Sequence, residues 1–216
     1  MASRPKPTSR KRPRTLFDRI GNRGWRGSGH FTFTVVSGAL RRWIVGRLPK
    51  TPRTILSLGC GSGELERRIA EAGHRVVGVD VSLPILRSAR RRGMTAAVMG
   101  DAMQLPFRDA SFDYVLLAET IGYVDLPVAF AEASRVLKKR GRLLITTYAP
   151  PVEAHIRYRK YRHDEIVGPL ADAGFRVAES SFLRVNRSKA SVAARSEDAA
   201  VLFLEGRKRA ARPISG

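Results

Sequence analysis

Three glycines, at positions 59, 61 and 63, follow a short apolar run at residues 54–58 and precede a segment with helical spacing. Glycine permits a tight turn and lets a ligand approach the backbone, because no Cβ stands in the way. Asp80 closes the next apolar run, 21 residues after Gly59, where a carboxylate can accept hydrogen bonds from both hydroxyls of a ribose. Asp101 closes the third run and can accept from an exocyclic amine. Together these residues predict a pocket for an adenosine group.

The residue after the last glycine discriminates between adenosine cofactors. A dinucleotide-binding loop has a third glycine at position 64, but this sequence has Glu64, whose negative charge would compete with a pyrophosphate at the start of the helix. The Lys-Ser/Thr ending of a nucleoside triphosphate loop is also missing. A cofactor without phosphate and with a positive centre fits better, and S-adenosylmethionine is such a cofactor.

The elements that must position these residues alternate along the chain. Short apolar runs indicate strands at residues 54–58, 75–79, 95–99, 112–118 and 142–148, and helical spacing indicates helices at 64–72, 83–92, 127–137 and 163–173. The alternation predicts an α/β fold, a doubly wound Rossmann-like sheet with parallel strands and helices on both faces. Two further strands, at 175–181 and 200–204, are separated by a polar loop at 186–196 with no helical pattern, so we expect them to pair antiparallel at one edge.

Five segments carry a resemblance to a known family. They are residues 55–63 (ILSLGCGSG), 76–82 (VVGVDVS), 100–107 (GDAMQLPF), 111–115 (SFDYV) and 135–145 (RVLKKRGRLLI). Their order and spacing resemble the class I S-adenosylmethionine-dependent methyltransferases, most closely the methyltransferase type 11 subgroup, which includes the ubiquinone/menaquinone C-methyltransferases. The match covers residues 54–148 and extends loosely to 204. The resemblance implies a seven-stranded sheet, mostly parallel, with an antiparallel last strand.

The resemblance also implies which residues bind the cofactor. They are Gly59, Cys60 and Gly61 beneath the methionine part, Asp80 and Val81 at the ribose and adenine, Asp101 and Ala102 at the adenine amine, and Ala118 and Glu119 at the methyl end. We interpret Cys60 as a small residue in a tight loop and not as a nucleophile.

Candidate catalytic residues follow the fourth and fifth strands. A general base is needed only where the acceptor carries a proton to be removed, as a phenol does, and the candidates are Glu119, Tyr123 and His155. The subgroup often has a His-His pair after the fourth strand, where this chain has Gly122 and Tyr123, so the acceptor stays open.

Several classes of acceptor can be compared from the sequence. Residues 119–122 lack the Asn/Asp-Pro-Pro-aromatic turn of enzymes that methylate exocyclic amines of nucleic acids, and no cysteine lies where pyrimidine carbon-5 methylation needs one. The first prediction is therefore O-, N- or C-methylation of a small-molecule substrate. The alternatives are methylation of RNA or of a membrane-associated lipid or quinone, and a non-catalytic regulatory protein that binds the cofactor.

Positive charge is concentrated at the beginning of the chain. The first 54 residues hold 14 of the 40 Lys and Arg residues but one of the 19 acidic residues. Such a region suits an anionic partner, RNA or an anionic membrane surface, or serves solubility alone. We expect a disordered basic arm at 1–14, an N-terminal helical cap at 15–53, the methyltransferase domain at 54–206 and a basic tail at 207–216.

Composition narrows the location of the protein and the kind of site. With Cys60 as the one cysteine, no internal disulfide can form, which favours a reducing, cytoplasmic compartment. The four histidines are scattered without metal-ligand spacing, so we expect no metal site. No apolar stretch reaches the roughly 18 residues that a membrane span requires.

Overall fold

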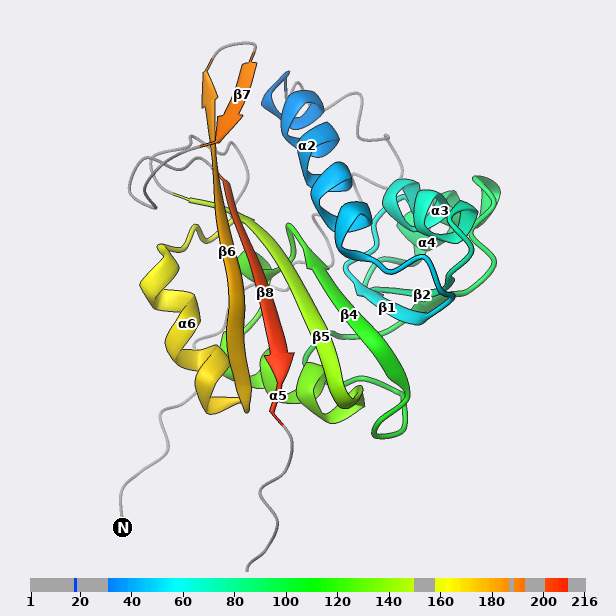
Figure 1. Ribbon diagram of the computed structural model, residues 1–216. Coiled ribbons are helices and arrows are strands. Elements are labelled where there is room, and N and C mark those ends of the chain that lie inside the picture. Colours follow the sequence, from blue (N-terminus) through cyan, green and yellow to red (C-terminus); the bar gives the residue numbers. More distant parts are fainter. Residues whose placement is uncertain (1–17, 19–30, 150–157, 187–188, 193–200, 210–216) are drawn as a thin grey trace, which may run out of the picture.

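One mixed sheet organises the computed structural model, which describes residues 18, 31–149, 158–186, 189–192 and 201–209 (Figure 1). Its eight strands run in the order β3-β2-β1-β4-β5-β8-β6-β7. They are β1 (Thr54–Leu58), β2 (Arg75–Asp80), β3 (Ala97–Met99), β4 (Phe112–Ala118), β5 (Leu137–Tyr148), β6 (Phe175–Asn186), β7 (Lys189–Val192) and β8 (Val201–Lys208). The first five strands pair in parallel, whereas β8 is antiparallel to both β5 and β6, and β7 is antiparallel to β6.

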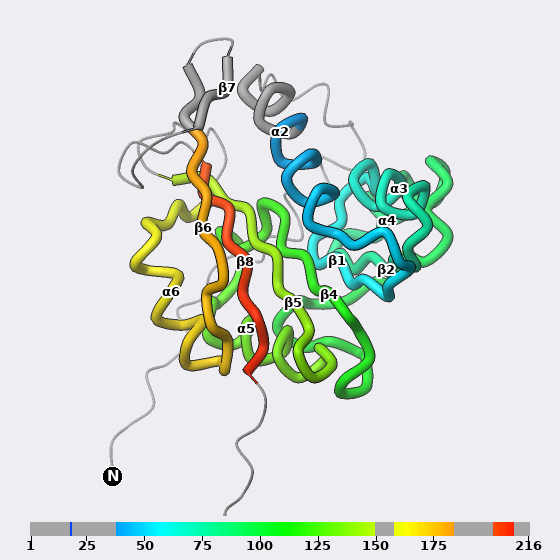
Figure 2. The backbone as a smooth tube through the Cα atoms, viewed as in Figure 1, coloured from blue at the N-terminus to red at the C-terminus, as the bar shows by residue number. Residues whose placement is uncertain are grey.

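Helices cover both faces of this sheet. They are α2 (Phe31–Arg47), α3 (Glu64–Glu71), α4 (Leu83–Arg91), the short 3-10 helix η2 (Ile121–Tyr123), α5 (Leu126–Val136) and α6 (His163–Asp172). Ile55 belongs to the core under α2 and α3, and its neighbour Leu56 to the core that includes α5 and α6. In Figures 1 and 2, α2 crosses the upper part of the near face, α5 lies behind the lower part of the sheet, and α6 lies beside β6 at the left. Because both faces are buried, the strands are nearly continuous apolar runs.

Two helices begin at clear sequence signals. Ser82 accepts a hydrogen bond from the Ile85 amide at 3.5 Å ahead of α4, and Asp125 accepts one from the Val128 amide at 3.3 Å ahead of α5. A proline in the first turn follows each cap. These caps fix where the chain turns back after β2 and after β4. They thereby help to hold the segments at the carboxyl ends of these strands, where the site lies.

The predicted fold class is confirmed, with corrections at the carboxyl-terminal side. All seven expected strands are present, and the last one in sequence, β8, is antiparallel as expected. The prediction of a polar loop over the whole of residues 186–196 is wrong, because residues 189–192 form an eighth strand that pairs with the end of β6. Strand β8 ends at Lys208, beyond the expected domain end at 206. The arm at 1–14 and residues 210–216 of the tail lie outside the described residues.

Three arginines form a row across the neighbouring strands β5, β8 and β6. Arg142 of β5 is the register partner of Arg207 of β8, which is in turn the partner of Arg176 of β6. Register partners point to the same face of a sheet, so these like charges are neighbours. Glu205, which is 3% exposed, accepts from Arg207 at 3.0 Å and lies 3.5 Å from Arg142. The buried carboxylate of Glu205 thus forms ion pairs with two of the three guanidinium groups.

Candidate active site

The glycine loop after β1 is held from two sides. The amides of Gly59 and Cys60 both donate to the carbonyl of Val79, at 2.8 and 3.1 Å, which joins the loop to the end of β2. The hydroxyl of Thr120, just after β4, donates to the carbonyl of Leu58 at 2.8 Å. Gly59 has a φ of +70°, and a Cβ there would collide with the Thr120 side chain. Only glycine therefore fits at position 59, where the chain turns closely past Thr120.

Asp80 is the acid at the end of β2, and the structure places it against the glycine loop. Its carboxylate accepts from the amide of Gly61 at 3.1 Å and from the amide of Ser82 at 3.0 Å. The side chain is buried, with 8% of the residue exposed, and burial raises the pKa of Asp80 despite these hydrogen bonds. Ser82 also donates to Asp18 at 2.7 Å. Each carboxylate oxygen keeps a lone pair with which it can accept a ribose hydroxyl.

The segment after β3 carries Asp101 and Ala102. The Asp101 carboxylate accepts from the Met103 amide at 2.9 Å, and Asp101 forms an isolated β-bridge with Gln104. Ala102 is buried in the apolar core, and Val81, at the end of β2, is half-buried. Since β2 and β3 are paired neighbours, Val81 and Asp101 emerge from the same edge of the sheet, as a flat adenine ring requires.

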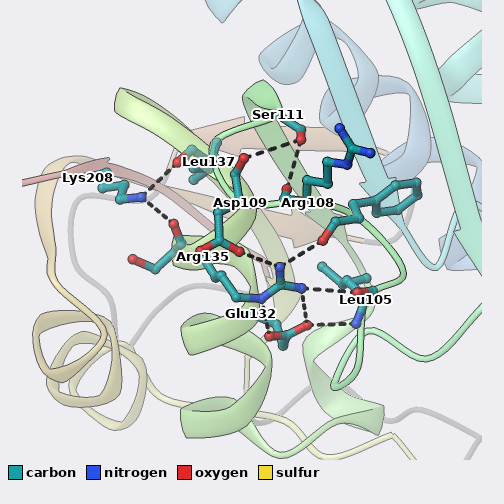
Figure 3. Close-up of polar contacts among 10 residues, drawn as sticks. Leu105, Arg108, Asp109, Ser111, Glu132, Arg135, Leu137 and Lys208 are labelled. Atoms are coloured by element: carbon teal, nitrogen blue, oxygen red, sulfur yellow. Dashed lines mark hydrogen bonds and ion pairs between the residues drawn. The ribbon is translucent and has the colours of Figure 1, made fainter.

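Arg135 of α5 fixes the loop that continues from Asp101 to β4 (Figure 3). Its guanidinium donates to the carbonyls of Leu105 and Phe107, at 3.0 and 2.8 Å, and to the carboxylates of Glu132 and Asp109. Glu132 also accepts from the Leu105 amide at 2.7 Å. Asp109 is thus a structural residue. No helix is assigned to this crossover, so these hydrogen bonds replace helical ones in ordering its backbone.

We expect Arg135→Ala to lower the free energy of unfolding by about 2–3 kcal/mol, because two backbone carbonyls and two carboxylates lose a charged donor at once. Urea denaturation checks this value. Arg91→Ala, which removes an exposed arginine from α4, is the matched control and should change stability by less than about 0.5 kcal/mol. Equal effects of the two substitutions would contradict the structural role of Arg135.

Glu119 lies directly after β4 in an unusual backbone conformation. Its φ is 55°, a left-handed value that costs a residue other than glycine about 1 kcal/mol. The Oε1 atom of its side chain is buried and has no hydrogen-bond partner among the described residues. Burial raises the pKa of Glu119 to about 7, although the Tyr148 hydroxyl and the charge of Arg41 act in the opposite direction. Glu119 can therefore exchange a proton near neutral pH.

Three tyrosines surround this carboxyl group. Tyr158 packs edge-on against Tyr123 and Tyr148, with ring centroids 4.9 and 5.7 Å away, and its hydroxyl lies 2.7 Å from that of Thr147. Burial raises the pKa of all three phenols, so they remain protonated donors near neutral pH. Tyr123, a candidate base in the sequence, is placed beside Glu119 as a neutral phenol. His155, the third candidate, lies outside the described residues.

Sequence reasoning missed several residues of this region. Tyr148 and Tyr158 were not predicted to contact Glu119, because that contact depends on how the chain returns after β5. Glu66 of α3 was also missed; it is buried behind the glycine loop, where Ser57 donates to it at 2.6 Å. A signal existed for Glu66, because it lies one turn before Ile69 on the apolar side of α3. Cys60 is buried, and burial raises the pKa of its thiol, so the thiolate is disfavoured.

Known proteins similar to this chain carry the same domain. The family model described as "Methyltransferase domain" matches residues 56–145. A demethylmenaquinone methyltransferase of Thermus thermophilus is 38% identical over 119 residues, which cover 51% of this chain and 54% of the relative. Another, from Corynebacterium kroppenstedtii, is 31% identical over 154 residues, 67% of this chain and 65% of the relative. The chain belongs to the class I S-adenosylmethionine-dependent methyltransferases.

The solved structures agree with this assignment. A chain of the Haloferax volcanii complex between the Trm112 methyltransferase activator and a methyltransferase matches with a TM-score of 0.72 at 25% identity, over 90% of this chain and 98% of that one. The chain spans between about half and two thirds of the length of the two curated relatives. Among the described residues, no helix is long and apolar enough to cross a membrane, and no cluster of His, Cys, Asp and Glu could hold a metal ion.

The residues of this methyltransferase fit S-adenosylmethionine, the cofactor of its family. The charge of the site supports this fit. Asp80 and Glu66 are buried acids, and within the described part of the chain neither is paired with a lysine or arginine. Oxygens of Glu66 and Glu119 are buried without a partner there. Buried acids without cations favour a ligand that brings positive charge and disfavour a pyrophosphate.

Proposed function

We propose that this methyltransferase acts on a small aromatic acceptor of the quinol type, at a ring carbon or ring oxygen. The observation that carries the proposal is the Glu119 carboxyl, which titrates near pH 7 within a wall of tyrosines, one residue away from the contact between Thr120 and the glycine loop. Aromatic side chains give a flat ring a surface to pack against. The similar proteins named demethylmenaquinone methyltransferase support an acceptor of this class.

Each part of the site has its own task in this proposal. Asp80 accepts the ribose hydroxyls, Val81, Asp101 and Ala102 bound the adenine, and the backbone of residues 59–61 lies beneath the methionine part, with Ala118 beside it. S-adenosylmethionine supplies a methyl group activated on a sulfonium. Glu119 accepts the proton of the acceptor hydroxyl while the new bond to the methyl carbon forms and the carbon–sulfur bond breaks. The neutral tyrosines exclude water and orient the acceptor ring.

The function is tested by measuring formation of S-adenosylhomocysteine with a panel of acceptors. A reduced 1,4-naphthoquinone with a short side chain should support turnover, whereas a primary alkyl amine and an RNA oligonucleotide should not exceed the rate without acceptor. Turnover with the amine or the RNA alone would reject the quinol class. Binding of the cofactor without turnover on any acceptor would instead favour a regulatory protein.

An anionic partner is the second candidate, supported by the basic amino-terminal sequence and by the row of Arg142, Arg207 and Arg176. The row lies in the middle of β5 and near the amino end of β6, six residues along β5 from Tyr148, about 20 Å at 3.3 Å per residue. It is therefore suited to anchoring the protein and not to presenting a methyl acceptor. Retention on RNA or on anionic vesicles at near-physiological salt would support this candidate.

We place the protein in the cytosol, where its buried thiol stays reduced.

A further inference from the structure

Glu66 is a buried carboxyl group on the protein side of the glycine loop. It is the third residue of α3, its side chain faces the sheet, and 3% of the residue is exposed. One oxygen accepts from the hydroxyl of Ser57 at 2.6 Å, and Ser57 stands two residues before the loop begins. The other oxygen, Oε2, is buried with no partner among the described residues. The carboxyl group next to residues 59–63 therefore has one hydrogen-bonded oxygen and one oxygen without a hydrogen bond among the described residues.

The charged groups around Glu66 are acidic. Asp80 at the end of β2 and Glu64 on the same helix both raise its pKa, and the thiol of Cys60 in the loop is close enough to feel its charge. Glu64 is itself paired with Arg41 of α2 at 2.7 Å. Burial is the largest cause of the shift and raises the pKa of Glu66 to about 7. A glutamine would keep the hydrogen bond to Ser57 without this cost, so a role for the charge explains the acid better than packing does.

We propose that Glu66 is a positioning residue for the cofactor, the negative charge beneath the glycine loop that offsets the net positive charge of S-adenosylmethionine. This inference rests on the proposed use of that cofactor and deepens it. Glu66 acts through the loop, since residues 59–63 separate it from the ligand side. The cation stabilises the carboxylate, so binding near pH 7 drives a proton from Glu66 into solvent. The reaction product S-adenosylhomocysteine lacks the sulfonium charge and gains little from Glu66, which helps its release after transfer.

The test compares two ligands that differ in charge. Isothermal titration calorimetry with Glu66→Gln should give about tenfold weaker binding of S-adenosylmethionine, because the variant loses a charge of opposite sign at an intermediate dielectric constant. Binding of S-adenosylhomocysteine should change by less than about threefold. Titrations in buffers of different ionisation enthalpy should show that the wild type releases more protons on binding S-adenosylmethionine at pH 7 than Glu66→Gln does. Glu71→Gln, an exposed change on the same helix, is the matched control and should leave both affinities unchanged.

A charge exchange separates the role of the charge from packing. Ser57 and Glu66 touch, so the double variant Ser57→Asp/Glu66→Ser moves the carboxylate from α3 to β1 and should restore the preference for S-adenosylmethionine that Glu66→Gln loses. Equal losses for both ligands, or no loss for either, would overturn the inference and leave Glu66 a packing residue. If the wild type bound neither ligand, the proposed function itself would fail, which is a different result.

Discussion

Asp80→Ala is expected to weaken binding of S-adenosylmethionine at least about hundredfold, because the variant loses charged hydrogen bonds to two ribose hydroxyls, each worth about 1.5–3 kcal/mol. The loop loses a contact as well, since Asp80 accepts from the amide of Gly61. Asp80→Asn should be intermediate, because its amide has one acceptor oxygen. Calorimetry with the purified protein gives the affinities directly.

The control for Asp80 is an acid at the opposite end of the sheet, on a strand that β1 separates from β2. Asp113 of β4 accepts from the Thr54 amide at 2.9 Å and from Lys138 at 3.0 Å, so its carboxylate has a structural role. Asp113→Ala should lower stability and leave the affinity for the cofactor unchanged. If Asp80→Ala bound S-adenosylmethionine as tightly as the wild type does, the prediction that Asp80 binds the ribose hydroxyls would be wrong.

Glu119→Gln is expected to lower kcat by about 10²–10⁴-fold, the usual contribution of a general base, with a small change in cofactor affinity. The pH dependence follows from the pKa of about 7. Only the deprotonated carboxylate accepts a proton, so wild-type kcat should rise from pH 6 to pH 8 and level off above the pKa. The residual rate of Glu119→Gln should be flat across that range. Steady-state assays of S-adenosylhomocysteine formation measure both.

Two neighbouring variants make the result for Glu119 specific. Tyr148→Phe removes the hydroxyl that lowers the pKa of Glu119, so this pKa should rise and the pH profile should shift upward. Thr120→Ser keeps the hydroxyl that donates to Leu58 and should retain most activity. A Glu119→Gln enzyme with an unchanged rate and pH profile would show that the acceptor needs no base.

Strand positions were predictable where an apolar run ends at glycine or an acid. Residues 54–58 and 112–118 were placed with the bounds that the structure has, because buried parallel strands show as unbroken apolar runs. The start of β5 was placed late, because residues 138–142 are mostly charged and lack the pattern of a strand. Strand β7 was missed because four residues that pair only with β6 show too little periodicity.

The cofactor side of the site was more predictable than the acceptor side. The positions of Gly59, Asp80 and Asp101 follow from local sequence, since each stands at or just after the end of an apolar run that forms a strand. The contacts of Glu119 with Tyr148, and of Ser57 with Glu66, join segments whose approach depends on the packing of the whole sheet. Sequence patterns carry no record of such pairs, so the acidic character of the site emerged from the structure.

The row of Arg142, Arg207 and Arg176 makes the stability of the native state depend on ionic strength. Folding brings these like charges together, and the one buried carboxylate of Glu205 offsets part of the repulsion. Dissolved ions screen repulsion between exposed charges, and the Debye length falls from about 30 Å at 0.01 M to about 8 Å at 0.15 M. The native state should therefore gain stability as ionic strength rises toward physiological values, and dilute buffers are the condition in which this sheet is weakest.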